Sequence, residues 1–323
     1  MTAAFIARRR SIVLAVGPTL VLAICGSCGR VEDEPWKVEE RAPPLTDGLT
    51  FSPPSEERVL LRRQLAPGMQ TDYAVRLDHQ VRARGHLMPA VATRVTDQMT
   101  LRESVLSGDP GRLDVMLSVE SADVSIDPAV ERTEDDREAA FLDTSLRTIV
   151  GPSGALGRLE ASNVPGEKPR ADLTAQEREV EEAVRRLLPI LPAEEVHVGD
   201  SWPLEREIVR NLPGEGTERV RQRGAYHFRG MVDWEDRVLA AVDLDYRVTV
   251  WGSSSLDGIS GTITGDGIGR AVYLIDPTSG TTMRSQAVET TRLAMALAAE
   301  KRRTTGEQYS RLTYDLTLME EAQ

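Results

Sequence analysis

The amino-acid sequence predicts a mainly β protein of the α+β class, with two weakly repeated antiparallel β-meander units and one central amphipathic helix. Several segments alternate apolar and polar residues with a period of two, and glycine and proline turns separate them, as in antiparallel strands with one wet face. One segment in the middle of the chain repeats its apolar residues at helical spacing instead. A half-open barrel packed on the helix is one arrangement that this pattern allows.

The central helix is expected over residues 174–189. Thr174 and Glu177 have the spacing of a capping box, and Pro189 disfavours a helical conformation of the residue before it. Between these ends, one apolar stripe follows the spacing i, i+4, i+7 and i+8, and it comprises Val180, Val184, Leu187 and Leu188. We expect this stripe to dock the helix on the β units.

The first β unit is predicted over residues 58–173. Alternation is clearest over 72–81 and 113–119, and the turn signal at 108–111 precedes the second of these runs. The segment 134–142 is interpreted as a short helix.

The second β unit is predicted over residues 190–323. It opens with a compact turn in which Asp200, after Gly199, is expected to cap the turn and Trp202 to join the core. Alternation returns over 242–250 and 308–318. The glycine-rich segment 265–269 lacks the spacing of a dinucleotide-binding loop, and a turn or bulge is expected there. For 285–299 the pattern is mixed, and a strand is favoured in its first half.

The first 27 residues have the pattern of a secretory signal. A basic segment with Arg8, Arg9 and Arg10 precedes an apolar run over 11–24. That run is short of the roughly 20 residues that span a bilayer. Residues 28–57 are rich in proline and acidic residues, so they are predicted to be a disordered tether.

Both cysteines of the chain lie at the end of this signal, so the folded region has no internal disulfide. Gly26 and Ser27 before Cys28 resemble a bacterial lipobox, in which small residues precede a cysteine that is acylated and becomes the new N-terminus. The resemblance implies an acyl anchor such as palmitate on Cys28, with Cys25 as the alternative. Gly29 stands where lipoproteins retained at the inner membrane commonly carry aspartate. The resemblance therefore implies an exported protein, anchored at the outer membrane and facing the periplasm.

A second resemblance concerns the folded region. The proline-bounded helix, the sequence V-G-D-S-W at 198–202 and the later turn at 276–280 resemble an uncharacterised family of bacterial envelope lipoproteins. This likeness covers about residues 58–318 and implies no activity. More loosely, the predicted strands and helix on an anchored chain are similar to half-open β-barrel lipoproteins that carry lipids or acyl chains.

Composition and motifs argue against nucleic-acid binding and catalysis. The net charge is −12, and loss of the three signal arginines would make it more negative, which disfavours nucleic acid as a partner. We find no catalytic, metal or cofactor motif. The four histidines are scattered and are expected to be structural. Asp243 and Asp245 share a strand face, where a solvated acidic stripe is favoured over a cation site.

Two functions from different classes remain. The first is a non-catalytic binding module, anchored to the membrane, for a lipid-like or other apolar ligand. The second is a structural or interaction lipoprotein of the envelope, with a dry core and a protein partner. An enzyme is the least expected of the three classes.

Overall fold

A computed structural model of the chain describes residues 14–16, 20–22, 49–53, 58–85, 88–109, 111–128, 133–162, 169–170, 172–211, 215–256, 259–299 and 302–319. Cys25, Cys28 and most of the predicted signal and tether lie outside these residues. Lipidation and the tether therefore stay predictions.

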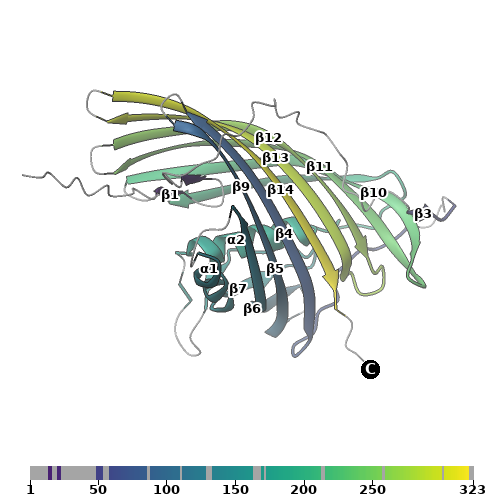
Figure 1. Ribbon diagram of the computed structural model, residues 1–323. Helices are drawn as coiled ribbons and strands as arrows, with labels where there is room; N and C mark the ends of the chain where they lie inside the picture. The colour runs from purple at the N-terminus through teal and green to yellow at the C-terminus, as the bar shows by residue number, and fades with distance from the viewer. Residues whose placement is uncertain are drawn as a thin grey trace, which may run out of the picture.

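One curved, unclosed antiparallel sheet makes up most of the described protein (Figure 1). Across the sheet the strands run β3 (Thr50–Phe51), β10 (Glu215–Trp234), β11 (Arg237–Leu256), β12 (Ile259–Ile275), β13 (Thr282–Ala299), β14 (Arg302–Leu318), β4 (Gln70–Gly85), β5 (Met88–Asp109), β6 (Arg112–Asp127), β7 (Ser145–Val150) and β8 (Glu160–Ala161), and β9 (Ser201–Asn211) also pairs with β10. Apart from this sheet, β1 (Leu14–Val16) pairs with β2 (Leu20–Leu22). The mainly β, antiparallel prediction is confirmed.

The two predicted β units contribute to the same sheet. Strand β14, near the end of the chain, pairs with β4, the first long strand, so that Leu312 lies opposite His79. The strands before the central helix and the strands after it are thus joined edge to edge. The structure therefore gives one sheet where the sequence predicts two units.

The glycine-rich segment 265–269 was predicted as a turn or bulge, and this was wrong. It lies inside the regular strand β12, where Gly269 is the cross-strand partner of Tyr246. A Cβ atom on Gly269 would lie only 2.0 Å from Cζ of the Tyr246 ring. Glycine is therefore required because the aromatic ring of the neighbouring strand lies across its backbone. The mixed segment 285–299 is likewise strand throughout, within β13.

Two helices lie on the concave side of the sheet (Figure 1): α1 (Thr133–Leu142) and α2 (Ala175–Leu187). Helix α2 begins with a capping box, because the Thr174 hydroxyl accepts from the Glu177 N–H and the Glu177 carboxylate accepts from the Thr174 N–H. It ends two residues before the predicted boundary. Among the described residues, no helix has the length and apolar character needed to cross a bilayer.

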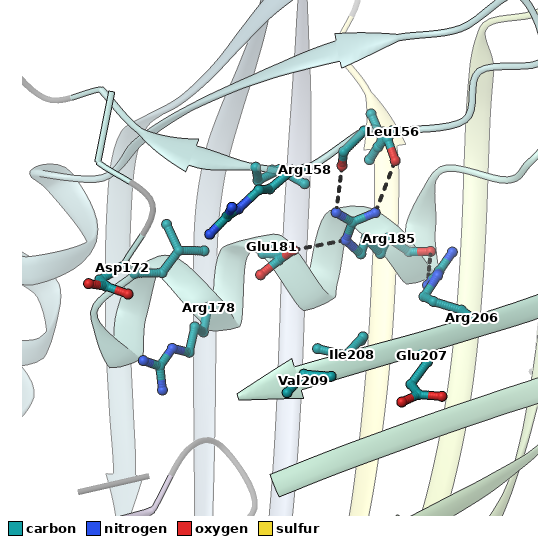
Figure 2. A pocket seen from close by; sticks show the side chains of 13 residues that line it. Leu156, Arg158, Asp172, Arg178, Glu181, Arg185, Arg206, Glu207, Ile208 and Val209 are labelled. Atoms are coloured by element: carbon teal, nitrogen blue, oxygen red, sulfur yellow. Dashed lines mark hydrogen bonds and ion pairs between the residues drawn. The ribbon is translucent and has the colours of Figure 1, made fainter. Parts of the chain in front are cut away.

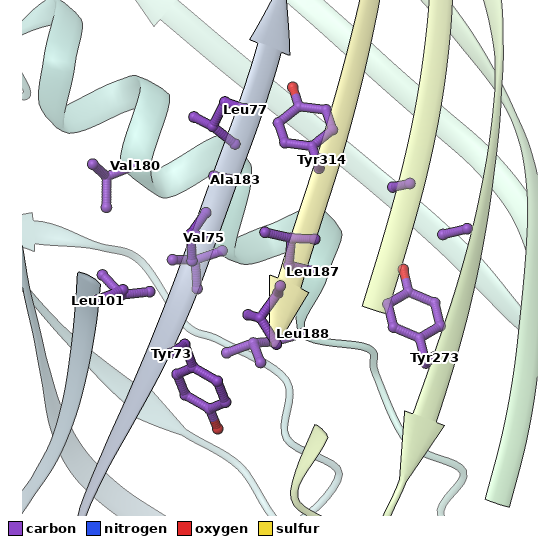
Figure 3. Packing of buried hydrophobic residues seen from close by; sticks show 14 of the residues in the cluster. Tyr73, Val75, Leu77, Leu101, Val180, Ala183, Leu187, Leu188, Tyr273 and Tyr314 are labelled. Carbon is purple, nitrogen blue, oxygen red and sulfur yellow. The ribbon is translucent and has the colours of Figure 1, made fainter. Parts of the chain in front are cut away.

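The apolar stripe of α2 faces the sheet. Its four residues are each at most 4% exposed, and they belong to the main hydrophobic core, as do Leu77 of β4 and Tyr314 of β14 (Figure 3). Burying a side chain of this size stabilises a fold by about 1.5–3 kcal/mol, as an upper estimate. The helix is therefore a major part of the core.

Side chains of three strands hold the C-terminal end of α2. The last carbonyl groups of a helix have no partner within the helix. Here the Tyr273 hydroxyl donates to the carbonyl oxygen of Arg186 at 2.7 Å, and the Ser285 hydroxyl donates to that of Leu187 at 2.8 Å. Arg206 Nη1 donates to the carbonyl oxygen of Arg185 at 3.1 Å. These bonds fix the end of α2 on β9, β12 and β13.

The convex face of the sheet carries charged side chains that meet the solvent, and a separate apolar cluster is also buried on it, formed by Val232, Leu239, Ala241, Val272 and Leu274. Cross-strand ion pairs lie along it, among them Arg102–Asp72, Arg94–Asp78, Arg84–Glu307, Arg284–Asp315 and Arg270–Asp245. An apolar concave face and a charged convex face are typical of an antiparallel sheet with water on one side. Function is therefore best sought on the concave side and along the open edges.

Candidate ligand-binding site

A pocket with a volume of about 410 Å³ opens beside α2, where the sheet does not close (Figure 2). Its walls are one face of α2, residues 206–209 of β9 and the two segments 156–159 and 172–173. Among the described strands, β9 pairs only with β10, so its other edge is left for this opening. Small-molecule sites are commonly clefts of roughly 300–1,000 Å³, and the pocket falls in this range. We call it the seam pocket.

The seam pocket combines apolar and cationic side chains. Its apolar residues are Leu156, Leu159, Leu173, Ile208 and Val209. Its cationic residues are Arg158, Arg178, Arg185 and Arg206. An amphiphilic lining of this kind can take a ligand that is partly apolar and partly charged.

Arg185 is engaged in holding the pocket wall together. Its Nε donates to Glu181 at 3.0 Å, and its Nη1 and Nη2 donate to the carbonyl oxygens of Leu156 and Gly157 at 3.2 and 2.7 Å. These bonds tie the segment 156–159 to α2. Arg185 therefore shapes the pocket and has little capacity left for a ligand.

Arg206 is partly buried at the end of the pocket near the C-terminus of α2. Besides its bond to the Arg185 carbonyl, its Nη1 donates to Oε1 of Gln222 at 3.4 Å. Within the described part of the chain, Arg206 forms no ion pair with a carboxylate. Burial lowers the pKa of the Arg206 guanidinium, and the positive charges of Arg185 and Arg186 act in the same direction. Arg206 thus stands in a positive environment.

The side chains of Arg158 and Arg178 also form no hydrogen bond or ion pair with any residue that the structure describes. In Figure 2, Arg178 lies toward the Asp172 end of the pocket and Arg206 toward the other end. The lining residue Glu207 is held by Arg219 at 3.0 Å. The lining carboxylate of Asp172 forms no ion pair with a described residue. Within the described lining, three unpaired arginines therefore outnumber one unpaired carboxylate, and the seam pocket keeps a net positive charge on a protein whose net charge is −12.

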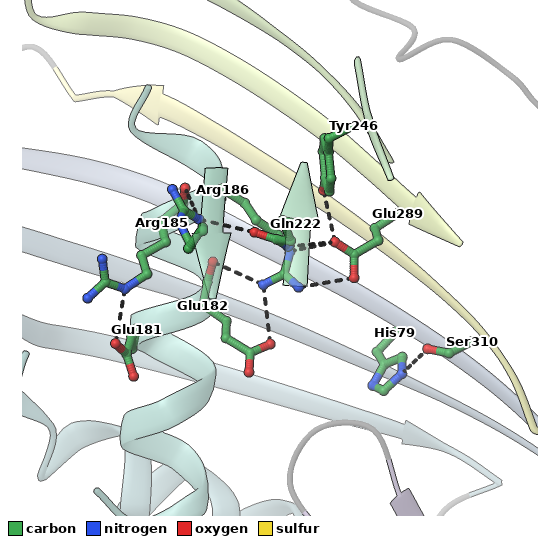
Figure 4. A network of polar contacts seen from close by, with 10 residues as sticks. His79, Glu181, Glu182, Arg185, Arg186, Gln222, Tyr246, Glu289 and Ser310 are labelled. Carbon is green, nitrogen blue, oxygen red and sulfur yellow. Dashed lines mark hydrogen bonds and ion pairs between the residues drawn. The ribbon is translucent and has the colours of Figure 1, made fainter. Parts of the chain in front are cut away.

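A buried polar network lies behind the pocket (Figure 4). Arg186 donates to both oxygens of Glu289 at 3.1 and 3.0 Å and to Glu182 at 3.2 Å. Glu289 also accepts from the Tyr246 hydroxyl at 2.9 Å and from Gln222 Nε2 at 3.2 Å. Because Gln222 also accepts from Arg206, the network connects the seam pocket with the centre of the sheet.

His79 interacts electrostatically with Arg186 and Glu289 of this network. Its Nε2 lies 2.7 Å from the Ser310 hydroxyl oxygen, and the two form a hydrogen bond (Figure 4). Burial lowers its pKa to about 4, and the charges of Arg137 and Arg186 lower it further than the nearby carboxylates raise it. The folded state thus holds His79 neutral, whereas an unfolded histidine binds a proton below about pH 6.5.

We expect His79 to make the fold less stable as the pH falls from about 6.5 to about 4, because only the unfolded state gains a proton in that interval. The loss should be on the order of 2–3 kcal/mol, since one pKa unit corresponds to about 1.4 kcal/mol. Urea unfolding at a series of pH values should show this slope in the parent and a shallower slope in His79→Gln. An equal slope in both proteins would contradict the assignment.

The turn at 199–202, for which the sequence predicts a structural role, lies beside the C-terminal end of α2. Gly199 has a φ of +96°, a conformation that favours glycine. The Asp200 carboxylate accepts from the backbone N–H of His197 at 2.8 Å. Trp202 Nε1 donates to the carbonyl oxygen of Ile190 at 2.7 Å, and its ring stacks on Tyr226 with a centroid distance of 5.5 Å. The turn therefore positions β9 against the chain that follows α2.

Other polar candidates lie away from the pocket. Asp243 and Asp245 are on the convex face, where they pair with Arg229 and Arg270. His86 lies outside the described residues. In the described portion, no group of three histidine, cysteine or acidic side chains is placed to hold a metal ion.

Sequence reasoning did not single out the arginines of the seam pocket. Arg158, Arg178 and Arg206 come from a loop, a helix and a strand that are far apart in the chain. The one available signal was on β9, where Arg206 occupies an inward position between Leu204 and Ile208. A charged residue in an apolar row is a hint, but its surroundings follow only from the fold.

No protein-family model and no curated protein matches the chain. Among solved structures, a loop-deletion variant of OmpT, an outer membrane protein of Vibrio cholerae, is similar at 7% identity over 77% of this chain and 100% of that one, with a TM-score of 0.20. OpdQ of Pseudomonas aeruginosa is similar at 7% identity over 78% of this chain and 99% of that one, with a TM-score of 0.23. OccK2 of the same organism, solved with glucuronate, matches at 7% identity over 79% of this chain and 100% of that one, with a TM-score of 0.21. We draw nothing about function from likenesses of this degree.

Proposed function

We propose that this protein is a non-catalytic binding module of the bacterial cell envelope that takes a lipid-like ligand into the seam pocket. The observation that carries the proposal is the pocket itself, which lies where the unclosed sheet meets α2 and has an apolar wall. Ile208 and Leu173 contribute to that wall. A short alkyl chain placed against them would be removed from water, which is favourable at about 0.8 kcal/mol for each buried CH₂ group.

The proposal includes an acyl anchor on Cys28, with the globular part facing the periplasm from the outer membrane. Its support is the sequence: a basic and apolar signal, small residues before Cys28 and a proline-rich segment after it. An anchored protein of this kind would hold its pocket close to a supply of amphiphiles. Peptide mass spectrometry of the mature protein should then find an N-terminal peptide that begins with an acylated Cys28.

Native mass spectrometry of the full-length protein, extracted gently from cells, tests the binding function. We expect a bound mass on the parent and its loss in Ile208→Trp, because the indole would fill the pocket. Thr249→Trp is the matched control, since Thr249 is exposed on β11 and away from the pocket. A parent protein with no bound mass, or equal occupancy in both tryptophan variants, would contradict binding in the seam pocket.

An interaction protein with a protein partner is the second candidate, and one observation favours it. Strand β9 has one edge without a neighbouring strand among those described, and Val209 on it is 54% exposed. Such an edge can accept a strand of another protein. A photo-crosslinker at Val209 would then capture one defined partner in cells, and a crosslinker at Thr249 would not.

A further inference from the structure

We propose that the seam pocket recognises an anionic group, a carboxylate or a phosphate, at the end of a short amphiphile, and that Arg206 is its main contact. This inference rests on the proposed binding function and names the chemistry of its ligand. Three observations carry it: the pairing of the other buried arginines, the free donors of Arg206 and the neighbouring unpaired cations.

The other buried arginines of this fold are neutralised by carboxylates. Arg63 pairs with Glu103, Arg137 with Asp97, and Arg186 with Glu289, and each of these carboxylates is at most 4% exposed. This is expected because a charge removed from water is costly unless it is paired. Arg206, which is partly buried, has no such carboxylate partner in the described chain, and it borders an open pocket. An anionic ligand would supply the missing counter-charge.

The guanidinium of Arg206 has donors left for such a ligand. It carries five N–H groups, and its two hydrogen bonds within the fold, to the Arg185 carbonyl and to Gln222, both use Nη1. Nε and Nη2 form no hydrogen bond within the described residues. These two nitrogens present parallel donors on one edge of a planar group, an arrangement that matches two oxygens of a carboxylate or a phosphate.

A role in holding the end of α2 accounts for only part of this arrangement. A helix carbonyl needs one donor, and a neutral side chain can provide it, as Tyr273 and Ser285 do for the next two carbonyls. The charge of Arg206 and its remaining donors are not required for that bond. Arg158 and Arg178, which also line the pocket and have no acidic partner in the described chain, increase its positive potential.

The apolar wall defines the rest of the ligand. Arg206 and Ile208 are two residues apart in β9, so their side chains lie on the same, inward face of the strand. A ligand whose anionic end meets Arg206 can therefore lay a short chain along Ile208. The volume of about 410 Å³ suits one such chain and not a two-tailed lipid.

Isothermal titration of the full-length protein in nanodiscs tests this inference with four probes: octyl phosphate, octanoate, octanol and inorganic phosphate. We expect an eight-carbon anion to bind at least about ten-fold more tightly than octanol, because hydrogen bonds to charged groups contribute about 1.5–3 kcal/mol. Arg206→Gln should remove this preference. Arg247→Gln, which changes an exposed arginine on the convex face of β11, should leave it unchanged. The preferred anion, phosphate or carboxylate, identifies the head group.

The same titration separates the two proposals. Octanol binding as tightly as the anions, with no effect of Arg206→Gln, would overturn the anionic head group and leave the binding module standing. No binding of any eight-carbon probe would overturn both. Inorganic phosphate binding as tightly as octyl phosphate would support the anion site and overturn the lipid-like ligand.

A measurement on the parent protein alone covers the case in which Arg206→Gln fails to fold. Added salt screens charge interactions, so it should weaken the binding of the eight-carbon anion and leave octanol unaffected. Arg206→Lys is the second variant, because it keeps the charge and one donor for the Arg185 carbonyl but loses the paired donors. It should fold and show an intermediate loss. Anion affinity that does not depend on salt would overturn the inference.

Discussion

Replacing Arg186 by methionine is expected to lower the free energy of unfolding by about 3–5 kcal/mol, because it leaves the Glu289 carboxylate buried without its ion pair. The side chains of Arg186 and Glu289 are only 5% and 4% exposed, and two hydrogen bonds join them. The same change also removes the contact of the guanidinium with the ring of Tyr314. Urea unfolding followed by circular dichroism measures the loss.

Two controls separate the buried ion pair from a general effect of losing an arginine. Arg292→Met removes an exposed pair with Glu307 and should cost about 0–1 kcal/mol. The double variant Arg186→Met, Glu289→Met should be less destabilised than the sum of its single variants, since it removes both charges of this pair and leaves only the Glu182 carboxylate without Arg186. Additive losses would show that the two residues do not act as a pair.

Replacing Val184 by aspartate is expected to prevent α2 from docking and to unfold or loosen the whole domain, with a loss of about 4 kcal/mol or more. Val184 is 1% exposed, within the core that α2 forms with the sheet. An aspartate there would be buried without a partner. Thermal melting followed by circular dichroism should show a lower midpoint or no cooperative transition.

Ala175→Asp is the control for this variant on the same helix. Ala175 is exposed in the first turn of α2, where a negative charge interacts favourably with the helix dipole. Its melting temperature should equal that of the parent or exceed it slightly. A Val184→Asp protein that melts like the parent would refute the docking of α2 and with it the account of the seam pocket.

Local structure was accessible from the sequence to the extent that it depends on neighbours in the chain. The capping box at Thr174 and Glu177 involves residues three positions apart, and alternation along a strand involves residues two positions apart. The strands β4 and β11 and the short helix α1 could be predicted from the sequence for the same reason. The glycine-rich part of β12 could not be predicted as strand in this way. Its Gly269 is required by the ring of Tyr246, which belongs to another strand.

The sequence by itself determined the alternating strands, the capping box of α2 and the apolar stripe on its buried face. Each of these depends on residues that are only a few positions apart in the chain. Only the tertiary structure decided that β14 lies beside β4 and that Arg158, Arg178 and Arg206 border one pocket. These pairings join segments that are distant in the chain, and the packing of α2 against an unclosed sheet brings them together. The site is therefore a property of the assembled fold and not of any one segment.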